Sequence, residues 1–247
     1  MSVAVMICSM APALVLLHGF THTGASWDRV VAALGERYLS LAPDIRGHGS
    51  AAGTTPVTLA AVIDDVLALA PDSFELVGYS MGGRLALHVA LAAPARVRRL
   101  SLIGASPGIE DAGEREQRRA ADEKLAAEVQ QLSIETFALR WAQTPVLAGL
   151  PEPVAAAVHR DRLRSTPAGL AAALRGLGTG ALPSLWHRLG ELSMPVALVV
   201  GERDEKFRAL ATAMAERIAD ARVIVVGGAG HAVHLEAPAQ TAAAVTG

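Results

Sequence analysis

A serine between glycines is the feature of this sequence best suited to chemistry. Ser80 lies in the pentapeptide GYSMG (78–82), which follows the apolar run 74–79 and begins a helix-like pattern. A G-x-S-x-G pentapeptide on a strand-to-helix turn is typical of a nucleophile elbow, where a strained serine points its hydroxyl out of the carboxyl edge of a sheet. The flanking glycines let strand and helix pass at close contact. The pentapeptide therefore predicts a reactive serine.

A serine hydroxyl needs a base to accept its proton, and the base needs an acid to orient it. His231 lies in GGAGHAVHLEAP, a Gly-rich loop after the last apolar run, 221–227. Asp204 lies in VVGERDEKF, directly after the preceding run, 196–201. Each residue follows a buried strand pattern, as Ser80 does. The sequence therefore predicts a catalytic triad of serine, aspartate and histidine, in the chain order of the α/β-hydrolases.

Other residues near these positions are alternative members of the triad. Glu202 or Glu205 is an alternative acid, and Asp204 is alternatively the N-cap of a helix and nothing more. His234 is an alternative base, but it lies where a helix is expected to begin. The placement of the strands favours the triad named above.

The loop LLHGF (16–20) follows the first strong apolar run. A turn at its end is expected to present the backbone N–H of Phe20 beside the serine. Together with the N–H of Met81, it would form an oxyanion hole with two donors. His18 is expected to brace this loop rather than to act as a second base, because the motif accounts for one base only.

Polar and aromatic residues near these loops are expected to support them. The loop PDIRGHG (43–49) is expected to be stabilised by hydrogen bonds of Asp44, Arg46 and His48. Trp27 is expected to pack near the mouth of the site.

Alternating apolar runs and helix-like patterns position these residues. The apolar runs are 13–17, 38–43, 74–79, 97–104, 196–201 and 221–227. The helical patterns lie near 26–36, 56–70, 81–93 and 206–219. Continuous apolar runs of this length indicate parallel strands that are buried on both faces. The sequence therefore predicts an α/β fold with a mostly parallel central sheet and flanking helices.

The alternation stops between 107 and 190, where the pattern indicates several helices and no strand. We therefore expect a hydrolase-like core formed by 1–106 and 191–247, with 107–190 inserted as a helical cap.

The composition excludes several functional classes. The net charge of −2 gives no reason to expect nucleic acid or an anionic membrane surface as a partner. No Cys/His cluster or H-E-x-x-H motif indicates a metal, and G-x-G-x-x-G is absent, so no cofactor is expected. The single cysteine, Cys8, permits no intramolecular disulfide and favours a reducing cytoplasm.

The apolar N-terminal stretch 3–17 does not match a targeting segment. Pro12 interrupts it, and no lysine or arginine precedes Arg29, so it fits neither a signal peptide nor a spanning helix. Two short strands around Pro12 are expected instead, with no insertion into a membrane. We expect a monomer or a weak homo-oligomer.

The whole chain resembles the α/β-hydrolase superfamily, and a narrower resemblance runs from about residue 13 to 240. The segments VGYSMGGRLAL, GASPGIEDAGEREQRRAAD, RWAQTPVLAGL, RLRSTPAGLAAAL, GERDEKFRALA and GAGHAVHLEAP resemble more narrowly the MenH family, the 2-succinyl-6-hydroxy-2,4-cyclohexadiene-1-carboxylate synthases of menaquinone biosynthesis. The discriminating features are the arginine four residues after the serine, the E-R-x-x-R run, the L-R-S segment and E-R-D-x-K-F.

The resemblance implies a lyase that eliminates pyruvate from a substrate with three carboxylates. Guanidinium groups suit carboxylates because they donate two parallel hydrogen bonds. By resemblance, the residues that bind the substrate are Arg84, Arg118 and Arg164, with Tyr79 and Trp141 lining the pocket and Lys206 as a further candidate. The sequence departs from the family at Ala142, where other members have a second aromatic residue after the tryptophan.

The resemblance also changes the expected role of the serine. In a lyase of this kind, Ser80 acts as a general base, its own proton passing to His231, and the oxyanion hole stabilises an enolate. One alternative is a serine carboxylesterase or lactonase with the same triad. A second alternative is an inactive hydrolase fold that serves as a ligand receptor, against which the intact triad argues.

Overall fold

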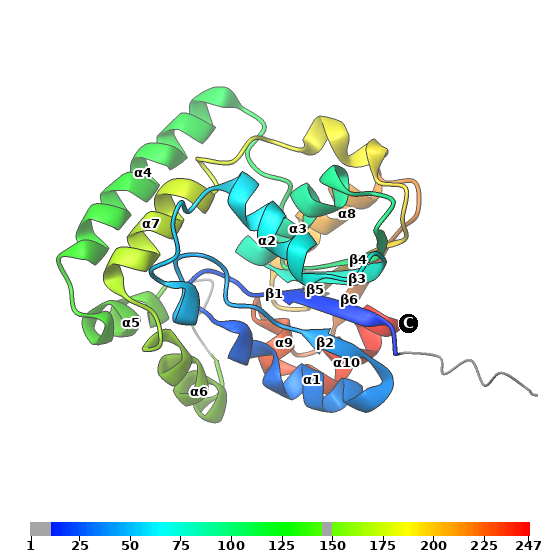
Figure 1. Ribbon diagram of the computed structural model, residues 1–247, viewed down its shortest axis with the longest axis horizontal. Coiled ribbons are helices and arrows are strands. Elements are labelled where there is room, and N and C mark those ends of the chain that lie inside the picture. The colour runs from blue at the N-terminus through cyan, green and yellow to red at the C-terminus, as the bar shows by residue number, and fades with distance from the viewer. Residues whose placement is uncertain (1–10, 145–149) are drawn as a thin grey trace, which may run out of the picture.

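A computed structural model describes residues 11–144 and 150–247 (Figure 1). Cys8 and the strand expected before Pro12 lie outside these residues, as does part of the RWAQTPVLAGL segment. No helix within the described ranges is long and apolar enough to cross a bilayer.

The described residues form one six-stranded sheet in the order β2-β1-β3-β4-β5-β6. Its strands are β1 (Ala13–Leu17), β2 (Leu39–Leu41), β3 (Phe74–Tyr79), β4 (Val97–Ile103), β5 (Val196–Gly201) and β6 (Ala221–Val226). All neighbouring strands are paired in parallel. Every residue of β1 and β5 is buried, which explains their unbroken apolar sequences. The predicted α/β class and parallel sheet are confirmed.

Helices cover both faces of the sheet (Figure 1). One face carries α2 (Leu59–Leu69), α3 (Met81–Ala92) and α8 (Glu205–Ala215); the other carries α1 (Asp28–Leu34), α9 (Val233–Glu236) and α10 (Pro238–Thr246). A separate apolar cluster fills each of the two interfaces, with Leu85 and Met214 in the first and Trp27 and Val245 in the second. The molecule is therefore a three-layer sandwich, as the alternation of patterns predicted.

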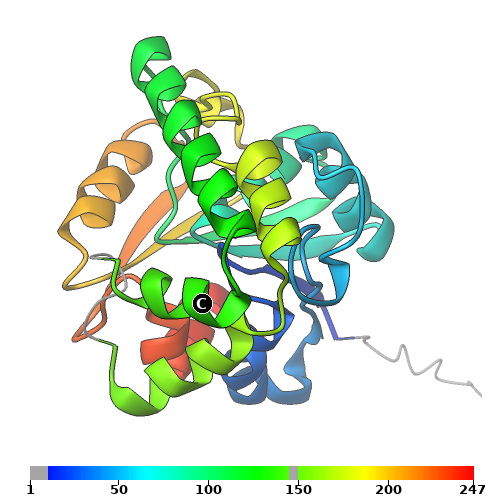
Figure 2. The same ribbon diagram turned by 90° about the vertical axis from the view of Figure 1, so that its left-hand side faces the viewer.

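Between β4 and β5 the chain forms α4 (Ala112–Gln130), α5 (Ile134–Ala142), α6 (Glu152–Arg162) and α7 (Pro167–Leu177). We call these four helices the helical segment. They lie beyond the carboxyl ends of the strands, and α4 and α7 run side by side across this end of the molecule (Figures 1 and 2). The division of the chain into a core and a cap domain stays a prediction.

The helical segment has its own apolar centre and its own helix caps. Val129, Phe137 and Leu170 belong to a buried cluster that α4, α5 and α7 share. The side chains of Asp111, Ser133 and Thr166 accept a hydrogen bond from the first turn of α4, α5 and α7, respectively, which defines where these helices begin.

Candidate active site

The turn between β3 and α3 holds Ser80 in a strained conformation. Its φ of 51° lies in the left-handed region that residues with a side chain avoid. A Cβ atom on Gly78 would lie 2.4 Å from the carbonyl oxygen of Gly82, and one on Gly82 would lie 2.2 Å from that of Leu17. The GYSMG sequence is therefore required by close backbone packing, which fixes the serine at the carboxyl edge of the sheet.

Ser80, His231 and Asp204 form a continuous chain of hydrogen bonds. The Nε2 atom of His231 is 3.3 Å from the Oγ of Ser80, and its Nδ1 is 2.6 Å from the Oδ2 of Asp204. The other carboxylate oxygen of Asp204 accepts the backbone N–H of Phe207 at 3.4 Å, so this residue is also the N-cap of α8. Asp204 is thus placed both to orient His231 and to cap a helix, the two alternatives that the sequence left open.

The alternative acids and base lie elsewhere. Glu202 accepts the backbone N–H of Gly228 at 2.8 Å, and Glu205 is exposed in the first turn of α8. His234 is fully buried between the rings of Trp27 and Tyr79, and burial lowers its pKa well below the ordinary value. This geometry favours Asp204 and His231 as the partners of the serine.

Glu236 supports the loop that carries His231, a role that was not predicted from the sequence. Its carboxylate accepts the N–H of Gly230 at 3.0 Å and pairs with Arg203 at 2.6 Å. Because Gly230 precedes the histidine and Arg203 precedes the aspartate, Glu236 links the two loops that carry the base and the acid. The signal in the sequence was a glutamate five residues after His231, together with the arginine of E-R-D.

The loop after β1 forms a turn beside Ser80. The N–H of His22 donates to the carbonyl of Gly19 at 3.1 Å, and a Cβ on Gly19 would lie 3.6 Å from that of Ser80. Phe20, in this turn, and Met81, the first residue of α3, line the same cavity as the serine. Among the hydrogen bonds of the described residues, none uses the N–H of Phe20 or Met81. Both donors are available to an anionic oxygen, as an oxyanion hole requires.

The neighbouring loops are braced as expected. The Nε2 of His18 accepts the N–H of Ile45 at 2.9 Å, and burial lowers the pKa of His18 to about 4, so the ring is neutral at pH 7. Asp44 accepts the N–H groups of Gly24 and Ser50, both at 2.7 Å. His18 therefore braces this loop, as predicted.

A cavity of about 1190 Å³ lies between the sheet edge and the helical segment. The sheet edge contributes Phe20, Ser80, Met81, Arg84 and His231 to its lining. The opposite side contributes Arg118, Asp122, Leu125, Trp141 and Leu174, while Lys206, Phe207, Leu210, Trp186 and Arg217 lie along its remaining wall. Cations and aromatic rings thus share one cavity with the serine.

The charged residues that line the cavity are four cations and four acids: Arg84, Arg118, Lys206 and Arg217, and Glu110, Asp111, Glu114 and Asp122. Two of these cations, Arg84 and Arg118, are arginines predicted to bind the substrate. Arg84, on α3, is buried enough to lower its pKa to about 10, so it remains cationic at pH 7, and its Nε has no protein partner among the described residues. Arg118, on α4, donates a hydrogen bond from its Nε to Asp122 at 2.7 Å. This contact leaves its two terminal nitrogens available to other partners. Such guanidinium groups suit a ligand with carboxylates.

Trp141 contributes an aromatic ring to the wall of the cavity on the side of the helical segment. Its ring meets that of Phe20 edge-on, with 5.2 Å between the centroids, so the helical segment touches the turn beside Ser80 here. Lys206 is exposed at the cavity, with its ammonium 5.7 Å from the ring centroid of Phe207. Ala142 is exposed and does not line the cavity, so this position contributes no ring to the aromatic wall.

The structure does not bring two predicted substrate-binding residues to the cavity. Tyr79 is only 2% exposed, and its ring is buried against Gly19, His231 and His234, because its position in β3 points it away from the cavity. Arg164 follows the end of α6 and is exposed. The expected packing of Trp27 near the mouth is also corrected, since it is fully buried.

Within the described part of the chain, no group of three or more histidine, cysteine, aspartate or glutamate residues is arranged to hold a metal ion.

The fold and the site agree with the comparisons with known proteins. The model of the alpha/beta hydrolase family matches residues 14–244. MenH from S. aureus has a similar structure, with a TM-score of 0.89 and 30% identity over 95% of this chain and 92% of that one. A thermophilic esterase from Thermogutta terrifontis is less similar, with a TM-score of 0.76 and 26% identity over 95% of this chain and 88% of that one. The chain belongs to the alpha/beta hydrolase family.

The curated relatives narrow this assignment. The 2-succinyl-6-hydroxy-2,4-cyclohexadiene-1-carboxylate synthase of Enterobacter sp. (strain 638) is 35% identical over 240 residues, which cover 94% of this chain and 89% of the relative. A Bacillus subtilis (strain 168) protein that provisionally carries the same name is 38% identical over 238 residues, 92% and 86% of the two chains. Within the alpha/beta hydrolases, the chain is a member of the MenH family.

Proposed function

We propose that this protein is a 2-succinyl-6-hydroxy-2,4-cyclohexadiene-1-carboxylate synthase. It eliminates pyruvate from 2-succinyl-5-enolpyruvyl-6-hydroxy-3-cyclohexene-1-carboxylate. The observation that carries the proposal is one cavity in which a serine bonded to a histidine faces two arginines, Arg84 and Arg118. The names of the relatives give the proposal independent support.

The chemistry is a proton abstraction followed by the loss of a leaving group. The Oγ of Ser80 removes the ring proton next to the succinyl carbonyl as its own proton passes to the Nε2 of His231. The electron pair of that C–H bond forms a new ring double bond, the existing double bond shifts, and the C–O bond to the enolpyruvyl group breaks. The proton held on His231 then neutralises the departing enolpyruvate, which becomes pyruvate, so the enzyme returns to its starting state.

The two free N–H groups stabilise the intermediate charge. As the C–H bond breaks, negative charge moves to the oxygen of the succinyl carbonyl. The N–H groups of Phe20 and Met81 are directed at this oxygen and stabilise it. Asp204 holds the imidazole in one tautomer and stabilises its protonated form. The roles of the triad in this reaction need no water and no covalent intermediate.

The cations of the cavity bind the carboxylates. Arg84 lies one helical turn after Ser80 and is placed for a carboxylate close to the reacting carbon. Arg118 binds a second carboxylate from the opposite side, with Trp141 against the ring. Lys206 is left for the third carboxylate. This polar, tricarboxylate substrate suits an enzyme of the cytoplasm.

A pyruvate-release assay tests the proposal. Purified protein is mixed with the cyclohexene substrate, and pyruvate is followed with lactate dehydrogenase. We expect pyruvate to be released in proportion to enzyme, and release to be lost in Ser80→Ala. A protein that instead hydrolyses short p-nitrophenyl esters with an acyl burst, and releases no pyruvate, is an esterase that uses the same triad. A protein that does neither, and whose serine resists a fluorophosphonate, is a ligand receptor.

A further inference from the structure

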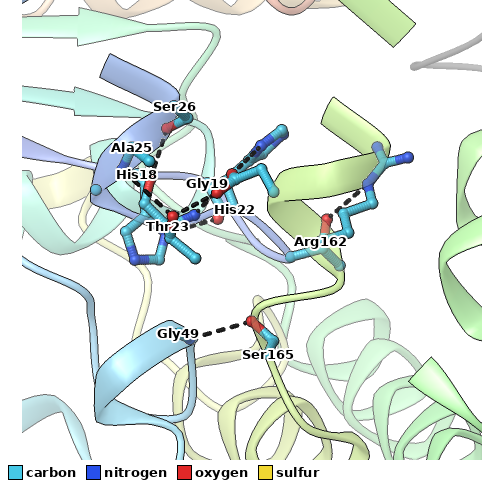
Figure 3. A network of polar contacts seen from close by, with 12 residues as sticks. His18, Gly19, His22, Thr23, Ala25, Ser26, Gly49, Arg162 and Ser165 are labelled. Atoms are coloured by element: carbon cyan, nitrogen blue, oxygen red, sulfur yellow. Dashed lines mark hydrogen bonds and ion pairs between the residues drawn. The ribbon is translucent and has the colours of Figure 1, made fainter. Parts of the chain in front are cut away.

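The end of α6 is fastened to the loop after β1 by buried hydrogen bonds (Figure 3). The carboxylate of Asp161 accepts the backbone N–H of Thr23 at 3.0 Å, accepts the hydroxyl of the same threonine, and lies 3.3 Å from the Nδ1 of His22. Asp161, His22 and Thr23 are all buried. Because a buried carboxylate is stable only when its oxygens are satisfied, these contacts fix the helix and the loop relative to each other.

The next residue of α6 reaches the same loop. The Nε of Arg162 donates to the hydroxyl of Thr21 at 3.2 Å, and Arg162 is only 2% exposed. Burial lowers the pKa of this arginine to about 10, so it is still charged at pH 7. Two neighbouring residues at the end of one helix thus bind three successive residues of the loop, Thr21 to Thr23.

The loop residue that Arg162 contacts is strained. Thr21 has a φ of 70°, and the hydrogen bond from His22 to Gly19 makes it the third residue of a β-turn. A positive φ at this position of a turn favours glycine, and a β-branched residue adopts it only when its surroundings impose it. Here the surroundings are the side chains from α6.

The same turn carries the N–H that faces the serine. Phe20 is the second residue of the turn, so the conformation of Thr21 and the position of the whole turn decide where that N–H points. The ring of Tyr79 fills the space beside Gly19, since a Cβ added there would be 2.7 Å from the ring. The turn is therefore confined by Tyr79 on one side and by α6 on the other.

We propose that Asp161 and Arg162 are positioning residues, which hold the strained Gly19–His22 turn so that the N–H of Phe20 is directed at the anionic oxygen beside Ser80. The helical segment therefore completes the oxyanion hole from a distance, in addition to lining the cavity. The inference rests on the proposed function only in that a developing oxyanion must be stabilised, which both elimination and ester hydrolysis require.

The test uses Asp161→Asn in the full chain, with Glu123→Gln as its matched control. Glu123 also links two helices of the helical segment, through Arg175 at 2.8 Å, but this pair is exposed and remote from the turn. The first readout is the rate at which a fluorophosphonate labels Ser80, because its P=O oxygen occupies the same pair of N–H donors. The second is the separation of kcat from KM for pyruvate release.

We expect Asp161→Asn to lower the labelling rate and kcat by about 10-fold, while KM changes less than 2-fold. This loss is smaller than the roughly 10²–10³-fold for removal of an oxyanion donor, because the N–H of Phe20 is misdirected but still present. Glu123→Gln should leave both rates unchanged. Thr21→Gly, added to Asp161→Asn, should restore most of the loss, because glycine adopts a positive φ without strain and the turn then holds itself. A residue that only stabilises the fold would give no such rescue.

Each remaining outcome decides between explanations. Unchanged labelling and kcat in folded Asp161→Asn overturns the inference, even if the variant melts at a lower temperature. If the wild type releases no pyruvate but Asp161→Asn still slows labelling, the proposed function fails and the positioning role stands. If Asp161→Asn does not fold, Thr23→Val removes a single hydroxyl bond to Asp161, and it should slow labelling about 3-fold; no slowing overturns the inference.

Discussion

The two walls of the cavity are built differently. On the sheet-edge wall, the side chains of His231 and Asp204 are 5% and 8% exposed and hydrogen-bonded to each other, and backbone packing fixes Ser80. On the wall formed by the helical segment, the side chain of Arg118 is 48% exposed. Buried, fully bonded groups are held in place before any ligand arrives, whereas exposed ion pairs contribute little and are easily replaced. We therefore expect the sheet-edge wall to supply the reacting groups together with one binding cation, Arg84, and the helical wall to contribute to binding alone.

The largest effect should follow from changing the sheet-edge wall. Ser80→Ala should lower kcat for pyruvate release by about 10²–10⁴-fold, the usual contribution of a general base, with little change in KM. Steady-state kinetics on the folded variant measures this. A loss confined to KM would show that the serine binds the substrate rather than removing a proton.

Removing charge from the cavity should give the next largest effect. Arg84→Ala should reduce kcat/KM for the anionic substrate by about 2–4 kcal/mol, because a buried partner for a carboxylate is lost. Hydrolysis of the neutral ester p-nitrophenyl acetate, or labelling by a neutral fluorophosphonate, should hardly change. Equal losses with both kinds of reagent would mean that Arg84 supports the fold and does not select the substrate.

The buried histidines near the sheet-edge wall should make stability depend on pH. Burial lowers the pKa of His18 to about 4 and that of His48 to about 3, and it lowers the pKa of His22 and His234 as well. Between the ordinary value of 6.5 and these values the unfolded chain binds more protons than the folded one. The free energy of unfolding is therefore highest above pH 6.5 and falls toward pH 4, by about 1.4 kcal/mol per pH unit for each of His18 and His48. His22 and His234 change it in the same direction.

Urea denaturation at pH 7, 6 and 5 measures this slope. His187→Gln, at an exposed position, is the control and should leave the slope unchanged. A flat profile between pH 7 and 5 would mean that the buried rings already carry protons in the folded protein.

A smaller effect should follow from freeing Arg118 on the helical wall. Asp122, which is 5% exposed, accepts from Arg118 at 2.7 Å and lies 3.3 Å from the N–H of Gly180. Asp122→Asn should raise KM about 5-fold without lowering kcat, because the guanidinium loses its orientation but keeps its charge. Should kcat fall and KM stay constant, Arg118 acts on the reacting atoms, and the division of roles between the walls is wrong.

The inner strands of the sheet were predictable because they are largely buried on both faces, whereas the edge strands β2 and β6 are partly exposed, contrary to the expectation. The runs at β3 and β5 match the strands at both ends, because every residue of these two strands except Glu75 is buried. The geometry around Ser80 was predictable for a related reason, because strand and helix approach so closely that only glycine is accommodated at 78 and 82.

The helical wall was less predictable because its side chains depend on where a helix ends. Arg162 and Arg164 are two residues apart, and α6 stops at the first of them, so Arg162 turns inward and Arg164 is exposed. No periodic pattern in the sequence reveals this difference between the two arginines. The contact of Asp161 with Thr23 joins residues 138 positions apart, and Glu236 acts through a backbone N–H, so neither leaves a local pattern.

The double use of Asp204 has a consequence for the entropy of the reaction. One oxygen of its carboxylate caps α8 and the other contacts His231, so the side chain has no free rotamer. A side chain that must be oriented loses conformational entropy at the moment it is ordered. Here that loss occurs once, when the helix forms during folding. Each turnover therefore begins with an imidazole that is already aligned, and the first turn of a helix maintains that alignment from one catalytic cycle to the next.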